Sequence, residues 1–534
     1  MIDIPDPAAQ EHFDFIVCGG GTAGCVLARR LAEDPRVRVL VLEAGGDDRI
    51  EAVRNATTWM RTIGTELDWQ FRAEPSDWLD GRSAPLPMGK VLGGGSSVNG
   101  LVWARGHRSD FDYWAQQTGD AGWSYAAVLD LYKRIESWDG PADAARRGSD
   151  GPVYVTLPRD PVPLVSALVE ATAAVGIPAV ADLNGAAMEG GGACGIPNVT
   201  VRGRDERVSM ATAYLRPVMG QENLVVRLHA NVERIRFDGM RASAVEYTVN
   251  GSPRLAHAAT EIILSMGAIN TPKVLMLSGI GDERRLAEHG IALVQHLPGV
   301  GQNFQDHILV AGCVWEYQQP EAPRNNSAEF TFFCKSDPAL PAPDLQPVLE
   351  ECAFGSERVR SDFALPADPA LAWTLAPGLV RPHSRGHIAL TGNRPSDPVA
   401  VHANFLSDRR DVRALLRAVE LCREIGNSPP LRPYVRRELM PGPLPPGKME
   451  TWLRQAAGTY FHQSCTARMG RDKLAVVDGS LRVYGVRGLR IADASVMPAI
   501  TTGNTMAPCV VIGERAADLL RATHGLGAAQ EPAS

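Results

Sequence analysis

The apolar positions near the amino terminus predict a strand, a helix and a second strand in quick succession. Residues 13–18 (FDFIVC) form a short apolar run of β-prone residues. After a glycine-rich turn, residues 25–34 (CVLARRLAED) repeat apolar side chains at helical spacing, and residues 37–46 (VRVLVLEAGG) are again apolar and β-prone. Because strands joined by a helical crossover run parallel, this pattern predicts a βαβ unit in an α/β sheet.

Further strand-like runs return late in the chain and far from one another. They cover residues 223–237, 260–268 and 488–495. Proline-rich, irregular stretches lie between them, such as residues 320–330 (PEAPRNNSAEF) and 338–347 (PALPAPDLQP). We therefore expect a nucleotide-binding lobe assembled from discontinuous segments, with a second lobe inserted mainly between about residues 306 and 457. The tail, residues 525–534, is expected to be disordered.

Three glycines follow the first predicted strand with the spacing of a dinucleotide-binding turn. Gly19, Gly21 and Gly24 form G-x-G-x-x-G at the opening of the predicted helix. The first permits a tight turn, the second lets backbone approach a pyrophosphate, and the third allows close packing of helix on strand. Glu43 ends the second strand, where a carboxylate accepts hydrogen bonds from a ribose. The pattern predicts a dinucleotide site without separating NAD from FAD.

A second glycine-rich segment spans residues 89–100 (GKVLGGGSSVNG). Its small residues would let backbone amides close over the phosphates or ring of a cofactor. A flexible loop without any ligand would have the same composition. Two such loops nevertheless suit an extended cofactor buried across the lobe.

Composition and charge limit the kinds of partner and the location that we expect for this protein. The chain has 534 residues, 45% hydrophobic and 22% charged, with a formal net charge of −7 and no long basic run, so no nucleic-acid partner is expected. No apolar run reaches the roughly 18 residues of a membrane span, and the start lacks the pattern of a secretory signal. Nine cysteines without a CxxC pair then indicate reduced thiols in a cytoplasmic protein. Peripheral membrane association and oligomeric state stay open.

Residues 460–470 (YFHQSCTARMG) place a histidine, a serine, a cysteine and an arginine close together. His462 and Cys465 suit a metal pair, a thiol nucleophile with its base, or one working histidine beside a bystander. A metal is not expected, because no second His/Cys pair at ligand spacing is present, and the glycine between His383 and His387 favours a structural turn. A buried, inert thiol is the commoner fate of a lone cysteine.

Several motifs, spread over nearly the whole chain, resemble the motifs of one protein family and occur in the same order. They are the glycine turn with LEAG (residues 19–45), GKVLGGGSSVN (89–99), GAINTPKVLMLSGIG (267–281), VGQNFQDH (300–307) and the carboxyl-terminal stretch 476–508. Together they resemble the glucose-methanol-choline (GMC) family of flavin oxidoreductases, whose two signatures match residues 89–99 and 267–281. The resemblance implies FAD rather than NAD and the oxidation of an alcohol to a carbonyl compound.

The same resemblance implies an α/β protein with a Rossmann-like FAD lobe and an α+β substrate lobe on an antiparallel sheet. The implied FAD lobe comprises residues 1–152, 195–305 and 458–534, and the substrate lobe residues 153–194 and 306–457. The implied cofactor contacts are Gly19, Gly21, Gly24, Glu43, Val91, Gly95, Asn99, Val232, Asp493 and Ala494. Some relatives attach the flavin through a histidine in the first signature; Val98 and its neighbours include none, so noncovalent FAD is expected.

The family's catalytic motif, H-P-x-G-T-x-R-M-G, aligns with residues 462–470 (HQSCTARMG) and implies that His462 is the base. A histidine of near-neutral pKa suits removal of a hydroxyl proton as a hydride leaves. The chain departs from the motif at Gln463 and Cys465. The second catalytic position falls on Asn504, whose amide can hold the substrate oxygen but cannot act as a base. His307 is expected to stabilise the junction of the lobes.

These observations predict an FAD-dependent alcohol oxidoreductase that converts an alcohol, primary in the simplest case, to an aldehyde by hydride transfer to flavin N5. Its partners would be a small-molecule alcohol and either oxygen or another electron acceptor. Trp59, Trp69 and Phe461 are candidate walls of the substrate cavity, although each is as readily explained as core. A flavoprotein lyase and a noncatalytic FAD-binding electron-transfer partner remain the alternatives. The sequence does not identify the alcohol.

Overall fold

The first apolar run forms the central strand of a large sheet. Residues 15–18 are buried on both faces of the strand, as in a parallel strand covered from two sides. The computed structural model describes residues 10–527 and places this strand in a seven-stranded sheet of order β10-β2-β1-β13-β12-β11, with β27 also paired to β13. The strands are β1 (Gln10–Cys18), β2 (Val39–Leu42), β10 (Leu224–Arg227), β11 (Ala230–Asp238), β12 (Arg241–Val249), β13 (Ser252–Leu264) and β27 (Leu489–Ile491).

Strand pairing in this sheet agrees with the predicted α/β class and corrects two predicted strands. β10, β2, β1, β13 and β27 run parallel, while β12 and β11 extend the sheet as antiparallel neighbours. The single strand expected over residues 223–237 is two strands, because the chain turns at His229, where φ is +52°. The run expected from residue 260 begins earlier, at Ser252, because polar residues there pair with β12.

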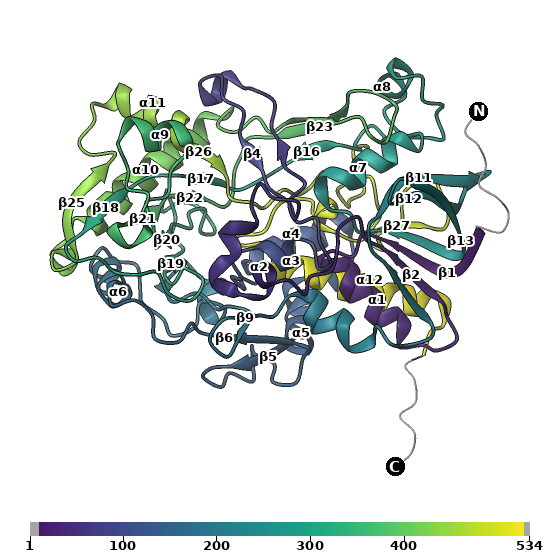
Figure 1. Cartoon of the computed structure of the whole chain (residues 1–534), viewed down its shortest axis with the longest axis horizontal. Coiled ribbons are helices and arrows are strands. Elements are labelled where there is room, and N and C mark those ends of the chain that lie inside the picture. Colours follow the sequence, from purple (N-terminus) through teal and green to yellow (C-terminus); the bar gives the residue numbers. More distant parts are fainter. Residues whose placement is uncertain (1–9, 528–534) are drawn as a thin grey trace, which may run out of the picture.

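Helix α1 (Thr22–Ala32) starts directly after the glycine turn and packs extremely close to its neighbours. Gly19 has φ +104°, a conformation that side chains rarely adopt, and a Cβ on Gly24 would lie 1.9 Å from the carbonyl oxygen of Gly19. On the other face of α1, a Cβ on Gly513 would lie 2.9 Å from that of Val26. Gly513 belongs to α12 (Met506–His524), so the carboxyl-terminal helix lies along the first helix (Figure 1).

A buried carboxylate ties α12 to its surroundings. Glu514 is fully buried and accepts hydrogen bonds from the guanidinium of Arg30 on α1, with N···O distances of 2.8–3.1 Å. Glu514 also accepts hydrogen bonds from the hydroxyl of Tyr214 and from the guanidinium of Arg134, each at 2.8 Å. Because a buried carboxylate is stable only when its lone pairs are satisfied, these donors hold the first, middle and last segments of this lobe together.

The second lobe, green in Figure 1, is built on a six-stranded sheet whose pairings are all antiparallel. Its strands, in spatial order, are β25 (Val435–Met440), β18 (Val314–Tyr317), β21 (Ala372–Ala376), β20 (Val348–Glu350), β19 (Thr331–Phe332) and β7 (Cys194–Gly195). Helices α10 (Arg409–Gly426) and α6 (Leu164–Ala174) pack in this lobe, and α10 buries its apolar face against β21. The antiparallel sheet agrees with the predicted fold class.

Shorter elements connect and cover the two sheets. The remaining α-helices are α2 (Glu51–Arg54), α3 (Gly95–Val98), α4 (Arg108–Thr118), α5 (Tyr125–Ile135), α7 (Gly267–Leu277), α8 (Glu283–Glu288), α9 (Glu357–Asp362) and α11 (Pro446–Ala456). The remaining strands are β3 (Phe71–Arg72), β4 (Pro85–Leu86), β5 (Glu136–Asp139), β6 (Val153–Thr156), β8 (Val201–Arg202), β9 (Glu206–Arg207), β14 (Ile280–Gly281), β15 (Gln295–His296), β16 (Gln302–Phe304), β17 (Ile308–Val310), β22 (Gly378–Leu379), β23 (Gly386–Leu390), β24 (Val399–His402) and β26 (Ala457–Thr459).

The lobe boundaries drawn from the sequence stay a prediction. β7 straddles the expected division at residues 194 and 195 and joins the antiparallel sheet. β16 pairs with β23, which links residues 302–304 to the inserted lobe. Of the predicted disordered tail, residues 525–527 follow α12, which ends at a Gly525 cap with φ +62°, and residues 528–534 lie outside the described residues.

The contact between Gly24 and Gly19 generates a stability prediction. Gly24→Ala should lower the free energy of unfolding of the cofactor-free protein by about 3 kcal/mol, because the added methyl meets rigid backbone and the clash outweighs the helix propensity of roughly 1 kcal/mol that alanine adds. The measurement is thermal or urea unfolding. Gly21→Ala is the control, since its Cβ meets no atom of the protein within 3.8 Å. Equal stability of the two variants would contradict the packing role of Gly24.

Candidate active site

A cavity of about 1910 Å³, counted out to its open mouth, runs from the glycine turn to the antiparallel sheet. The residues predicted from the sequence that line it are Gly19, Gly21, Glu43, Gly95, Asn99, Val232, His462, Asp493, Ala494 and Asn504. Trp59, Trp69 and Phe461 line it as well. Gly24 and Val91 do not: Gly24 is buried under the turn and Val91 packs beside Gly45. Their contact with the cofactor stays a prediction.

The two glycine loops face each other across one end of the cavity. A Cβ on Gly94 would lie 2.8 Å from Cα of Gly21, so the loops are nearly in contact. A Cβ on Gly95 would meet no protein atom within 4 Å, which leaves space on the cavity side. α1 has Gly21 at its amino end and no side-chain cap, so the amides of its first turn are available to an anion. This arrangement fits a pyrophosphate.

Glu43 lies at the carboxyl end of β2 with both carboxyl oxygens held by backbone. Its Oε2 accepts from the amide of Gly20 at 2.9 Å and its Oε1 from that of Gly45 at 2.8 Å. Burial raises the pKa of Glu43 to about 7, although these hydrogen bonds oppose the rise. Each oxygen keeps a second lone pair, so the side chain can still accept from the hydroxyls of a ribose.

Asp493 is fixed at the other side of the cavity by three donors. Its Oδ2 accepts from the amide of Gly267 at 2.9 Å and from the hydroxyl of Thr271 at 2.6 Å, and its Oδ1 accepts from the amide of Ser495 at 2.8 Å. Burial raises its pKa. The carboxyl group thus orients the backbone at Ala494, which lines the cavity beside it.

The His462 segment is anchored by a buried aspartate. Asp306 accepts the backbone amide of His462 at 2.9 Å and the hydroxyl of Thr459 at 2.5 Å. β17 pairs with β26, so Ile308 lies opposite Thr459 and His307 reaches the same place as His462. Phe461 takes φ +68°, an uncommon conformation that costs on the order of 1 kcal/mol and aims the histidine at the cavity.

The His462 ring lies in a chain of hydrogen bonds. Gln346 Nε2 donates to Asn504 Oδ1 at 3.0 Å, and this orientation turns Asn504 Nδ2 toward His462 Nε2 at 3.2 Å. His462 Nε2 is then an acceptor, and its ring proton lies on Nδ1, which donates to Nδ1 of His307 at 2.9 Å. The amide orientations therefore place the lone pair of His462 Nε2 on the cavity side, where Asn504 Nδ2 donates to it.

Burial keeps the imidazoles of His462 and His307 uncharged. It lowers the pKa of His462 to about 3 and also lowers that of His307, which the neighbouring His462 ring depresses further. Both imidazoles are therefore neutral near pH 7. Tyr460 stacks on the His462 ring with centroids 5.0 Å apart, which fixes its plane. A neutral imidazole with its lone pair at the cavity is able to accept a proton from a bound hydroxyl.

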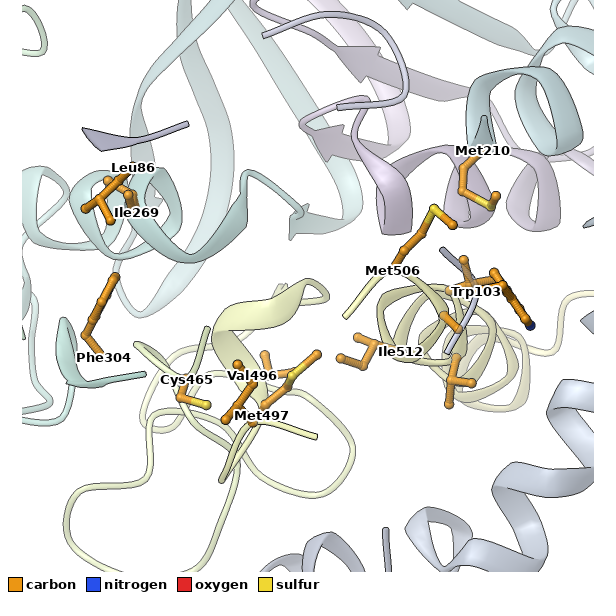
Figure 2. Packing of buried hydrophobic residues seen from close by; sticks show 14 of the residues in the cluster. Leu86, Trp103, Met210, Ile269, Phe304, Cys465, Val496, Met497, Met506 and Ile512 are labelled. Atoms are coloured by element: carbon orange, nitrogen blue, oxygen red, sulfur yellow. The ribbon is translucent and has the colours of Figure 1, made fainter. Parts of the chain in front are cut away.

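The other candidates of the 460–470 segment take structural roles. Cys465 lies outside the cavity lining, in the buried cluster that contains Val496 and Met497 (Figure 2). Burial raises the pKa of its thiol, so it stays protonated and is a poor nucleophile. Within residues 10–527 no group of three or more His, Cys, Asp or Glu side chains has the arrangement of a metal site, and His387 stacks on His402 instead of pairing with His383.

Three residues at the site escaped the sequence reasoning. Gln346 orients Asn504, yet it belongs to a proline-rich stretch expected to be irregular. His307, expected only at the lobe junction, contacts the His462 ring directly. Glu350 on β20 lines the cavity although nothing in its sequence neighbourhood marks it. Each reaches the site through strand pairing between distant segments, which local patterns do not record.

Comparison with known proteins settles the family. The family model described as GMC oxidoreductase matches residues 13–309 in its amino-terminal part and residues 382–513 in its carboxyl-terminal part. The chain belongs to the GMC oxidoreductase family. This confirms the resemblance, the two-lobed fold class and an oxidoreductase acting on CH–OH donors. GMC oxidoreductases bind FAD, which confirms the predicted cofactor.

Relatives span nearly the full chain. The mitochondrial choline dehydrogenase of Homo sapiens is 36% identical over 96% of this chain and 90% of its own length. The oxygen-dependent choline dehydrogenase of Citrobacter koseri is also 36% identical, over 96% of this chain and 95% of its own. The crystal structure of pyridoxine 4-oxidase from Mesorbium loti has a TM-score of 0.91 and 31% identity, covering 96% of this chain and 100% of its own. Among the described residues of this GMC oxidoreductase, no helix has the length and apolar character needed to cross a membrane.

The position of Gly21 at the cavity predicts that a substitution there weakens FAD binding without lowering the stability of the cofactor-free protein. Gly21→Ala should weaken FAD binding about tenfold or more, because its methyl group would project into the space left for the pyrophosphate. The measurement is FAD fluorescence titration of the cofactor-free protein, with unfolding of that protein as the check on its fold. An unchanged dissociation constant would contradict this placement of the pyrophosphate.

Burial of His462 predicts an unusual titration. With its pKa lowered to about 3, the imidazole should stay neutral from pH 8 down to pH 5, whereas an ordinary histidine would take up a proton near pH 6.5. The measurement is NMR of protein carrying ¹³C-labelled histidine rings, with the His462 signal assigned by its loss in His462→Ala. A shift of that signal with a midpoint near pH 6.5 would contradict the burial argument.

Proposed function

We propose that this GMC oxidoreductase oxidises a primary alcohol to an aldehyde, with His462 as the base and noncovalently bound FAD as the hydride acceptor. The observation that carries the proposal is the unprotonated Nε2 of His462 at the cavity, 3.2 Å from Asn504 Nδ2. A substrate hydroxyl would take the place of that amide donor on the lone pair. A base in that position takes the hydroxyl proton while a hydride leaves the same carbon.

His462 is prepared for this step by its neighbours. Its low pKa keeps Nε2 unprotonated, although it also makes the free imidazole a weaker base than the near-neutral histidine expected from the sequence. When Nε2 takes the proton, the ring becomes cationic while negative charge develops on the substrate oxygen beside it, which offsets the cost of a buried cation. The Nδ1 proton meanwhile remains hydrogen-bonded to His307, so the ring keeps its orientation through the transfer.

Asn504 is the group proposed to hold the substrate oxygen. Its Oδ1 is occupied by Gln346, which keeps the amide nitrogen turned to the cavity. One hydrogen of that nitrogen points to His462, and the other is free to donate to the substrate oxygen. A donor fixed before the reaction stabilises alkoxide character without reorganising, which is the usual advantage of a preformed hydrogen-bond donor.

Bound FAD supplies the acceptor for the hydride that leaves the carbinol carbon. Val98 and its neighbours on α3 provide no histidine for a covalent link, which supports noncovalent binding. Completion of a turnover requires a second acceptor for two electrons, oxygen or another, and peroxide formation in air distinguishes the two. The names of the relatives agree with alcohol oxidation, since choline and pyridoxine both carry hydroxyl groups.

A panel of primary alcohols mixed anaerobically with the FAD-loaded protein tests the proposed reaction. Loss of the oxidised flavin absorbance, with the matching aldehyde found in the mixture, is the expected result. The retained pair of His462 and Asn504 supports oxidation over the lyase alternative. An absorbance that no alcohol bleaches would exclude the proposed function.

The assignment of the base has its own prediction. His462→Ala should slow anaerobic flavin reduction by about 10²-fold or more, because the hydroxyl proton loses its acceptor, while FAD stays bound. Stopped-flow absorbance measures the reduction rate. Cys465→Ala is the matched control, a buried residue of the same segment that does not line the cavity, and its rate should stay within a few fold. Unchanged reduction in His462→Ala would remove His462 as the base.

A further inference from the structure

The cavity contains a buried carboxyl group that the proposed reaction does not use. Glu350, the last residue of β20, lines the cavity and is only 6% exposed. Its Oε2 is buried and has no hydrogen-bond partner within residues 10–527. Burial raises the pKa of Glu350 to about 8. A buried polar atom without a partner is costly in a folded protein and marks a place where a ligand completes the bonding.

Hydrogen-bond donors around Glu350 are engaged elsewhere. The hydroxyl of Thr374, opposite Glu350 in the neighbouring strand, donates to the carbonyl of Cys352 at 2.7 Å. The hydroxyl of Thr331 donates to the carbonyl of Pro347 at 2.7 Å. The indole of Trp59, also at the cavity, donates to the carbonyl of Asn326 at 3.0 Å. The protein therefore offers no free donor from these groups to the carboxyl.

A second unsatisfied acceptor, on Gln346, lies on the same segment at the reacting end of the cavity. Gln346 Oε1 is buried and has no partner in the described part of the chain, since the amide nitrogen of Gln346 is the atom that binds Asn504. The hydroxyl of Tyr460 donates to the backbone carbonyl of Gln346, at 3.3 Å, and not to the cavity. Gln346 Oε1 is an acceptor, and Glu350 Oε2 accepts as well when its carboxyl group is ionised. A ligand that donates hydrogen bonds and gives up or shares a proton with Glu350 suits both atoms.

The charged groups of the cavity also favour a ligand that donates a proton. No lysine or arginine of residues 10–527 lines it, and the ionisable side chains that do include the carboxyl groups of Glu43, Asp68, Glu350 and Asp493. An anionic substrate would find no cation here to pair with. A group that brings a proton and a positive charge would find Glu350.

Glu350 and the reaction site lie along one strand edge. Gln346, Val348 and Glu350 alternate along the chain and all line the cavity, as expected for one face of an extended segment. Gln346 contacts Asn504, so this face begins at the reacting hydroxyl. An extended chain rises about 3.3 Å per residue, which places Glu350 on the order of 10 Å farther along. One substrate can therefore contact both ends.

We propose that Glu350 binds a basic nitrogen of the alcohol substrate, so that the enzyme prefers alcohols bearing an amine or a heteroaromatic nitrogen that shares a proton with this carboxyl group. The proposal rests on the proposed function for the other end of the substrate. It requires an N–H, which a tertiary amine has when protonated and a quaternary ammonium lacks.

Matched alcohols test the preference. The amines are 2-(dimethylamino)ethanol, 4-(dimethylamino)butan-1-ol, 6-(dimethylamino)hexan-1-ol and pyridin-4-ylmethanol, and their carbon counterparts are 3-methylbutan-1-ol, 5-methylhexan-1-ol, 7-methyloctan-1-ol and benzyl alcohol. The wild-type protein should show a kcat/KM at least about tenfold higher for one or more amines than for the counterpart. Glu350→Gln, which keeps size but not the ionisable group, should reduce that ratio to within threefold.

Glu351→Gln is the matched control. Glu351 is the adjacent buried carboxyl group, and its pKa is also raised by burial, to about 9. It does not line the cavity and instead accepts the backbone amide of Arg324 at 2.7 Å. Its variant should keep the wild-type ratio. Glu350→Leu serves if Glu350→Gln purifies without FAD, and the same loss of preference is expected.

Three outcomes would overturn the proposal. One is an amine preference that survives in Glu350→Gln, and another is the absence of any preference in the wild-type protein. The third is the N-methylated quaternary analogue of the preferred amine reacting as well as that amine. If no alcohol is oxidised, the proposed function fails, and binding still tests Glu350: N,N-dimethylpropylamine or 4-methylpyridine should perturb the flavin absorbance in wild type and not in Glu350→Gln. No perturbation in wild type would then reject the nitrogen site.

Discussion

One buried carboxyl group, that of Asp306, holds the reacting end of the molecule together. It binds the backbone amide of His462 and the hydroxyl of Thr459, so the segment that carries His462 is attached to the strand that follows His307. Together with the bonds from the amides of Tyr460 and Phe461 to His307 and Thr459, this attachment opposes relaxation of the unusual backbone at Phe461. The positions of both histidine rings follow from this contact, and the neutral state of those rings follows from the depth at which it holds them.

The two ends of the cavity differ in how they meet a ligand. At the nucleotide end, backbone amides line the cavity, and glycines such as Gly19, Gly24 and Gly94 are needed because an added Cβ would meet neighbouring backbone. At the substrate end, the groups are side chains of an antiparallel sheet, where alternate residues face the cavity. Backbone amides at the nucleotide end restrict the cofactor to a single shape. Side chains at the substrate end can be exchanged by substitutions along one strand, which allows the substrate preference to change.

The sequence predicted the nucleotide end well because its signals are local. Gly19, Gly21 and Gly24 lie within six residues and follow a buried strand, so spacing alone indicates their geometry. His462 and Asn504 came from family resemblance, and their contact is a feature that spacing does not contain. Gln346 and Glu350 were missed because β20 owes its place to pairing with strands from distant parts of the chain, in a stretch whose prolines suggest no regular structure.

The packing of α12 against α1 also has a consequence for biosynthesis. α1 is made well before its apolar partner α12, which is not complete until residue 524 has been added. At roughly 5–20 residues per second, the first helix waits at least about 25 seconds without its partner. This surface of α1 therefore stays uncovered by α12 while the residues between the two helices are synthesised, and their packing forms only after residue 524.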